Sequence, residues 1–225
     1  KFELDKKNQP ENIVYKTTKS SNKLIEEFML LANKKVAEKM RKSKELFVYR
    51  VHDQPDQEKL KNLQTVVKRL GYNLKLSSNE LNDSLNSLLK NAFGKNEQNL
   101  IDTLMIRSMS KAEYTTKNIG HYGLSFDNYT HFTSPIRRYP DVMVHRLIQA
   151  EIDGKKIKTD ETESLCKHST HMEILATKAE RDSIKLMQIK FMKDKEGKTF
   201  DAVISGVVAR GVFVEVIENK CEGLV

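Results

Sequence analysis

The stretch HFTSPIRRYPD, from His131 to Asp141, brings together the side chains that a phosphate-binding turn uses. Thr133 and Ser134 carry hydroxyl donors. Arg137 and Arg138 carry planar guanidinium groups that match phosphate oxygens. The proline that follows is suited to the first turn of a helix, and the free N–H groups at a helix start attract an anion. The segment therefore predicts an anion site where a helix begins.

Two rings in the same stretch extend this prediction to nucleic acid. Phe132 and Tyr139 offer faces on which unpaired bases stack. Two structural alternatives remain open, because a pair of arginines before a helix also serves as surface charge, and both rings also serve as core.

Composition sets outer limits on the class of protein. The 225 residues carry a net charge of +8 and a sequence pI of about 9.3, which suits either a polyanionic partner or a solvated lysine-rich surface. No apolar run approaches the ~20 residues that span a bilayer, so no membrane partner is expected. Cys166 and Cys221 lie far apart with no metal-ligand spacing, which favours a reducing compartment and no disulfide framework.

The first part of the chain predicts a hairpin over residues 1–19 with its return strand at Ile13–Tyr15, a helix from Ser20 or Ser21, and a strand over Leu46–Val51. The expected buried stripe of the helix is Leu24, Ile25, Phe28, Leu31, Ala32, Val36 and Met40. Three further helices are expected around Leu60–Leu70, Leu81–Leu89 and Leu100–Met105.

The later part predicts an irregular stretch over residues 110–135, a helix from Pro140, and one long or two shorter helices over residues 161–194. The expected buried positions of the last helical region are Met172, Leu175, Ala179, Met187 and Phe191. Strands are expected over residues 200–204 and 211–216, with a turn at Ser205-Gly206. The change of period places a domain boundary near residue 195.

Several short sequence motifs, taken in their order along the chain, resemble those of one known family. They are MSKAEY (109–114), HYGL (121–124), the stretch 131–141 and HRL (145–147), together with IEEFM (25–29), AN (32–33), YRVH (49–52) and AERD (179–182). They are similar to the ribonuclease II / ribonuclease R exoribonucleases. The resemblance implies an α+β fold: the mostly helical later part of an RNB catalytic domain over residues 1–195, followed by an incomplete OB-type β-barrel over residues 196–225.

The resemblance implies hydrolysis of RNA from its 3′ end, processively and to nucleoside monophosphates, with a divalent metal ion, Mg²⁺. Clustered carboxylates must hold such ions, and the nearest pair here, Asp53 and Asp56, does not match the family's motif. The ligands are therefore expected before Lys1, with none in this chain, and this chain alone is expected to be inactive. The expected partner is single-stranded or structured RNA, and the expected compartment is the cytoplasm. The alternative is a non-catalytic RNA-binding module.

The resemblance also implies roles for individual residues. Arg137 is expected to clamp the scissile phosphate, with a structural ion pair as the alternative. Glu26 or Glu27 is expected in the active site, and we favour Glu26 because adjacent helix positions point about 100° apart. Glu180 is expected to hold the terminal nucleotide; its apolar neighbours also predict partial burial and leave a structural ion pair open.

The remaining expected contacts with RNA are hydroxyls, a second guanidinium and rings of the same region. They are Thr133, Ser134, Arg138, Tyr139, His131, His121 and Tyr114. Each also has an ordinary structural interpretation, as a cap, surface or packed residue.

Overall fold

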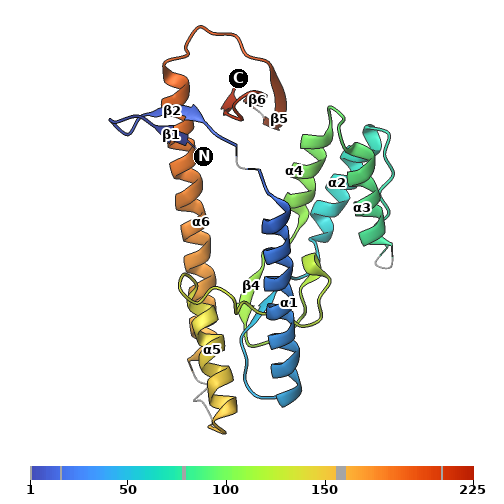
Figure 1. Ribbon diagram of the computed structural model, residues 1–225. Helices are drawn as coiled ribbons and strands as arrows, with labels where there is room; N and C mark the ends of the chain where they lie inside the picture. Colours follow the sequence, from blue (N-terminus) through green and yellow to red (C-terminus); the bar gives the residue numbers. More distant parts are fainter. Residues whose placement is uncertain (1, 16, 78–79, 156–160, 209) are drawn as a thin grey trace. The chain divides into compact units, whose positions relative to one another are not determined.

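The computed structural model describes residues 2–15, 17–77, 80–155, 161–208 and 210–225; Lys1 and Lys16 of the predicted hairpin lie outside these ranges. The chain forms two compact units, each assembled from separated segments (Figure 1). Unit 1 comprises residues 1–15, 55–110 and 182–225, and unit 2 comprises residues 16–54 and 111–181. Helices with small antiparallel sheets confirm the predicted α+β class.

Unit 2 is built around two short strands and the helices that pack on them. Its elements are α1 (Ser20–Ser43), β3 (Tyr49–Val51), β4 (Glu113–Thr115), a 3₁₀ turn (Tyr122–Leu124), α5 (Tyr139–Ile152) and the first part of α6 (Thr162–Lys193). Strand β3 pairs antiparallel with β4. The core lies between these elements and consists of Ala37, Met40, Phe47, Val48, Tyr49, Val51, Tyr114, Met143, Val144, Leu147 and Cys166.

Unit 1 contains a helical bundle and two small sheets. Its elements are β1 (Phe2–Leu4), β2 (Pro10–Ile13), α2 (Gln57–Arg69), α3 (Leu81–Ala92), α4 (Gln98–Ser108), the end of α6, β5 (Ala202–Val208), β6 (Gly211–Val216) and β7 (Glu222–Leu224). Apolar residues at helical spacing form the bundle core, which includes Leu60, Leu63, Val67, Leu85 and Ile101.

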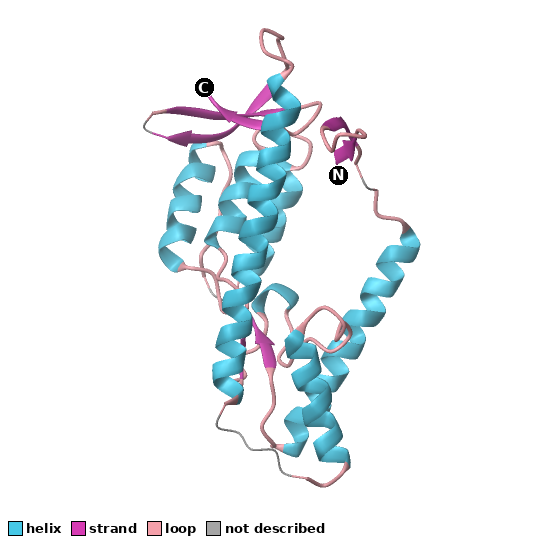
Figure 2. Ribbon diagram, turned by 90° about the vertical axis from the view of Figure 1, so that its left-hand side faces the viewer, coloured by secondary structure: helices cyan, strands magenta, loops and turns pink. Residues whose placement is uncertain are grey.

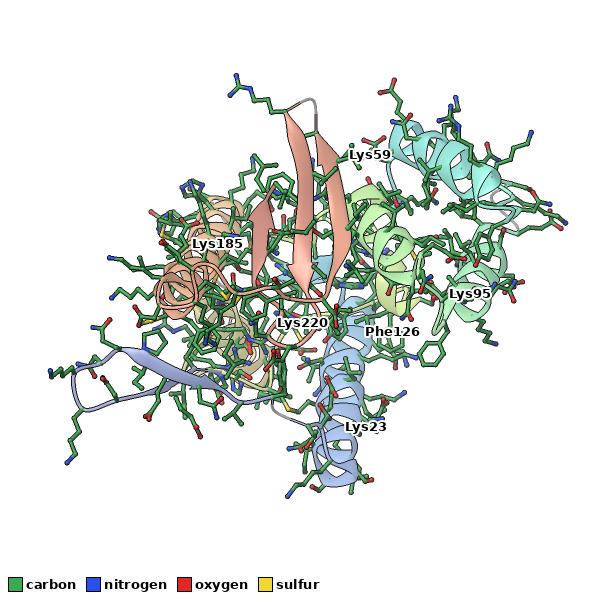
Figure 3. The ribbon with its side chains drawn as sticks, turned by 90° about the horizontal axis from the view of Figure 1, so that it is seen from above. Lys23, Lys59, Lys95, Phe126, Lys185 and Lys220 are labelled. Atoms are coloured by element: carbon green, nitrogen blue, oxygen red, sulfur yellow. The ribbon has the colours of Figure 1, made fainter. Side chains whose placement is uncertain are left out.

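The β5–β6–β7 sheet of unit 1 is an antiparallel meander, drawn as magenta arrows in Figure 2. The end of α6 contacts this sheet, because Lys185 donates from Nζ to the carbonyl of Glu222 and Gln188 donates to the carbonyl of Lys220. Figure 3 labels Lys185 and Lys220 beside the strands.

Most helix boundaries lie close to the predicted ranges. Asp56 is the N-cap of α2, where its carboxylate accepts from the N–H groups of Glu58 and Lys59. Gly71, which follows α2, has a φ of +85°, the left-handed conformation in which a glycine ends a helix. Residues 161–194, for which one or two helices were expected, form the single helix α6 up to Lys193.

The predicted burial of two helices is wrong over part of their length. On α1, four stripe residues are exposed, namely Leu24, Ile25, Phe28 and Leu31, whereas Ala37 and Met40 near its end are buried. On α6, Met172, Leu175 and Ala179 are exposed, and only Thr162 and Cys166 are buried among its described residues. Apolar periodicity indicates which face is apolar, but it does not indicate whether another element covers that face.

Three strand predictions also need correction. The strand predicted over Leu46–Val51 is confined to Tyr49–Val51, since pairing with β4 extends no further. The return strand of the hairpin begins at Pro10, before the predicted Ile13–Tyr15. Ser205-Gly206 is no turn; it lies inside β5, at an irregularity in the register with β6.

Candidate RNA-binding site

The segment from His131 to Arg138 is held at its far end by one buried carboxylate. Asp141, in the first turn of α5, is fully buried. Its Oδ1 accepts from the Ser134 N–H at 2.9 Å and from the Arg138 Nε and Nη2 at 3.2 and 2.9 Å. The carboxylate of Asp141 therefore has two effects: its charge complements the start of α5, and its Oδ1 closes the turn that carries Arg137.

The near end of the segment is held by an asparagine of α1. Asn33, 4% exposed, accepts the Phe132 N–H on Oδ1 at 3.0 Å and donates from Nδ2 to the Tyr129 hydroxyl at 3.1 Å. The Phe132 ring packs against the unit 2 core and stacks on the His145 ring at 4.2 Å. Of the two interpretations left open for Phe132, the structure supports the packed one. Asn33 was missed as a site residue, although a polar residue inside an apolar stripe was a signal for it.

Arg137 and Arg138 differ in what they can still bind. Arg137 is exposed; its Nη2 lies 3.5 Å from the Ser134 Oγ, and within the described part of the chain it forms no ion pair. Arg138, 20% exposed at its side chain, gives Nε and Nη2 to Asp141. Arg137 is thus available to an external anion with its whole guanidinium, whereas Arg138 offers only the Nη1 side.

Two cavities of unit 2 meet at Arg138. The first, which we call the α6 cavity, has a volume of about 620 Å³. Its lining is Tyr114, Arg137, Arg138, Tyr139, Pro140, His168, Ser169, Met172, Glu173, Ala176, Thr177 and Glu180. It unites four predicted RNA-contacting residues with Arg137, and Tyr139 is 47% exposed with its ring free for stacking. Glu180 is on the rim of this cavity but exposed, so its predicted burial is wrong.

The second cavity, which we call the α1 cavity, has a volume of about 550 Å³. Its lining is Thr18, Asn22, Ile25, Glu26, Met29, Leu30, Asn33, Tyr129, Thr133 and Arg138. Glu26 lines it and Glu27 does not, as the 100° step between adjacent helix positions requires. The Thr133 hydroxyl is buried here without a hydrogen-bond partner in the described structure. Ser134 and the two predicted histidines line neither cavity.

A cluster of rings lies beneath the segment. The Tyr114 hydroxyl and His131 Nδ1 share a hydrogen bond of 2.8 Å, and Tyr129 contacts both His131 and His121 edge-on. Burial, together with the nearby charges of Arg138 and Arg50, lowers the pKa of His131 to about 3. Burial likewise raises the pKa of Tyr114 to about 12 and lowers that of His121 to about 4. These groups are therefore neutral near pH 7 and support the site without adding charge.

The described ranges contain neither a cluster of metal ligands nor a membrane-spanning helix. Among these residues, no group of three or more His, Cys, Asp or Glu side chains is arranged to hold a metal ion. Likewise, no described helix is both long and apolar enough to cross a bilayer.

Comparison with known proteins identifies the family. The sequence model of the RNB domain matches residues 1–154, and the chain belongs to that family, as the sequence resemblance predicted. Ribonuclease R of Aquifex aeolicus is 39% identical over 209 residues, which cover 91% of this chain and 30% of that protein.

Two solved structures extend the comparison. Mycoplasma genitalium RNase R in complex with ribose methylated single-stranded RNA matches with a TM-score of 0.85 at 29% identity, covering 99% of this chain and 36% of that one. Yeast Ssd1, a pseudonuclease, matches with a TM-score of 0.72 at 25% identity, covering 91% and 26%. The chain thus spans about a third or less of the proteins it matches.

Proposed function

We propose that this chain is the RNA-gripping part of a 3′-to-5′ exoribonuclease that degrades RNA processively to nucleoside monophosphates. The observation that carries the proposal is Arg137, an exposed guanidinium on a turn fixed by the buried Asp141, at the rim of a cavity that also contains Tyr139 and Glu180. A phosphate, a base and a ribose would find a matching group there. Ribonuclease R, whose complex with single-stranded RNA resembles this chain, supports RNA as the substrate class.

In this proposal each side chain has a limited task. Arg137 binds the scissile phosphate and stabilises the charge that develops on it, while the Nη1 side of Arg138 positions a neighbouring phosphate. Tyr139 stacks on a base, and Glu180 accepts hydrogen bonds from ribose hydroxyls. Glu26 faces the reaction from the α1 cavity, next to the buried Thr133 hydroxyl.

Metal-dependent hydrolysis would use Mg²⁺ to activate water and stabilise the leaving oxygen. The described residues contain no cluster of ligands that fits such an ion, so we assign no residue of this chain to the metal and no step to it. The tasks assigned to this chain are the binding and positioning of RNA and the stabilisation by Arg137 of charge on the scissile phosphate.

The proposal extends to the end of the chain and to the compartment. Residues 196–225 would begin an OB-type barrel, since the β5–β6–β7 meander is the kind of sheet from which such a barrel is built. The two cysteines are free and buried, which is compatible with a cytoplasmic protein.

A second candidate is an RNA-binding module without nuclease activity. The likeness to yeast Ssd1 favours this second candidate, since Ssd1 has a similar fold and is a pseudonuclease. The surface groups needed for binding would be the same, so the two candidates differ only in turnover.

The experiment that separates them follows 5′-labelled single-stranded RNA with the complete gene product, with and without Mg²⁺. Stepwise shortening from the 3′ end, lost in Arg137→Ala while RNA binding persists, supports the exoribonuclease. Binding without shortening in either condition overturns it in favour of the binding module. Glu27→Gln serves as a matched control, because Glu27 lines neither cavity.

A further inference from the structure

The part of α6 that carries Glu180 is attached to unit 2 by polar contacts. Beyond the buried Cys166, no described residue of α6 up to Arg181 is buried, and Met172 and Leu175 are 39% and 53% exposed. Apolar burial therefore contributes little to holding this stretch in place. Its position depends on the few hydrogen bonds that it makes.

Among the described residues, the polar contact of α6 with another element that lies nearest to Glu180 on its N-terminal side is a bidentate ion pair between Arg50 and Glu173. Arg50 Nη1 donates to Glu173 Oε2 at 2.6 Å, and Nη2 donates to Oε1 at 3.1 Å. Glu173 and Glu180 are seven residues apart, which places them on one face of the helix with a rise of about 10 Å between them. Both line the α6 cavity.

Arg50 also contacts Tyr114, another residue of the cavity lining. The guanidinium carbon of Arg50 lies 4.5 Å from the centre of the Tyr114 ring. The Tyr114 hydroxyl is hydrogen-bonded to His131, the first residue of the segment from His131 to Arg138. The backbone N–H of Arg50 donates to the carbonyl of Tyr129, two residues before the segment from His131 to Arg138 begins. Arg50 is 12% exposed at its side chain and does not line the cavity, so its role is indirect.

We propose that Arg50 is a positioning residue that sets the spacing between Arg137 and Glu180 across the α6 cavity, and so the fit of one nucleotide between them. The statement that a nucleotide fits between these residues depends on the function proposed above. The statement that Arg50 sets their spacing does not depend on it. A guanidinium suits this task because its flat face stacks on a ring while its edge binds a carboxylate with two parallel bonds. An ammonium group lacks both features.

Steady-state kinetics on single-stranded RNA with the complete gene product provides the first test, using Arg50→Lys, Glu173→Gln and the double variant. Each single change should raise KM about tenfold and change kcat less than about twofold, because the contact acts on binding geometry. The double variant should also stay near tenfold, since both changes remove one shared interaction. A KM increase near the product of the two single effects would overturn the proposal, as would an unchanged KM in Arg50→Lys.

A matched control separates positioning from a general loss of stability. Glu38 of α1 is paired with Lys35 of the same helix at 2.9 Å, is 31% exposed at its side chain and lines neither cavity, so Glu38→Gln also removes the charge of a paired carboxylate. Glu38→Gln should leave KM within about twofold of the parent. If Glu38→Gln raises KM as much as Glu173→Gln does, or if the KM effects only follow the fraction of unfolded protein, the proposal fails.

The spacing itself is measured without RNA. Spin labels on I136C and L175C report the distance between the segment and α6, since Ile136 is 102% exposed and Leu175 is 53% exposed. Cys166 and Cys221 are buried, and burial raises the pKa of both thiols, which protects them from labelling. Glu173→Gln should shift or broaden the distance distribution, and an unchanged distribution refutes the positioning role. If the protein neither binds nor shortens RNA, the proposed function fails while this distance still decides the role of Arg50.

Discussion

Replacing Asp141 with alanine removes the acceptor that holds the turn between Ser134 and Arg138. Truncating one partner of a buried ion pair costs about 3–5 kcal/mol when the other partner stays fully buried. Arg138 is 20% exposed at its side chain and would regain some hydration, so we expect a loss of about 2–3 kcal/mol in the free energy of unfolding. For a protein of this size, each kcal/mol lowers the unfolding temperature by about 2–4 °C, which gives a decrease of about 4–12 °C.

Thermal unfolding followed by circular dichroism measures this loss. Asp141→Asn should cost less, about 1–2 kcal/mol, because an amide oxygen still accepts the Ser134 N–H while the charge opposite Arg138 is lost. Asp127→Ala is the matched control: Asp127 is exposed, so its removal should change stability by less than about 0.5 kcal/mol. If Asp141→Ala also stays within about 0.5 kcal/mol of the parent, the buried carboxylate does not hold the turn and our account of the site is refuted.

Three other predictions address the charged and titrating groups of unit 2. Arg137→Ala should lower kcat/KM on RNA about 100-fold. It should leave the unfolding temperature within about 1 °C, because the side chain is exposed. A loss of kcat/KM that is accompanied by a fall in the unfolding temperature would contradict a direct role of Arg137. Glu26→Gln should slow RNA decay at least about tenfold and Glu27→Gln less than about twofold, since of these two residues only Glu26 lines the α1 cavity. Equal effects of the two variants in a decay assay would refute the assignment of Glu26, rather than Glu27, to the site. Below pH 6.5, His121 and His131 should destabilise the fold, because their lowered pKa values of about 4 and 3 keep them unprotonated while the unfolded chain takes up protons. Urea unfolding should show stability falling by roughly 1 kcal/mol per pH unit for each histidine between pH 6.5 and 4.5, and a flat profile would argue against their burial.

The sequence predicted the elements of the fold well where local chemistry determines them. Gly71 marks the end of α2, and the proline after Tyr139 marks the start of α5, because such residues act within one turn of backbone, whereas the N-cap role of Asp56 was not predicted. The exposure of Phe28 and Leu175 was not predictable in this way. It depends on which distant segments cover a helix, and the apolar pattern of that helix carries no such information.

The site was predicted in part for the same reason. The arginines and hydroxyls of residues 131–141 are neighbours in the chain, so the sequence alone shows that they are grouped. Asn33 and Arg50 reach the site from α1 and β3, and only the fold brings them to Phe132 and Tyr114. Glu180 was predicted to be partly buried because its neighbours one helical turn away, Ala176 and Ile184, are apolar. Both neighbours are themselves exposed.

The interleaving of the two units has a consequence for the order in which the chain folds during synthesis. Unit 2 needs residues 16–54 and then residues 111–181, and the pairing of β3 with β4 joins Tyr49 to Thr115, with the whole helical bundle of unit 1 between them in the sequence. A chain emerging from the ribosome therefore holds α1 and β3 without their partners until β4, α5 and the start of α6 have been made. The bundle of α2, α3 and α4 has no such delay, because its core residues lie between Leu60 and Met105. We expect the bundle to fold first and the segment from His131 to Arg138 to be among the last parts of the chain to reach its final structure.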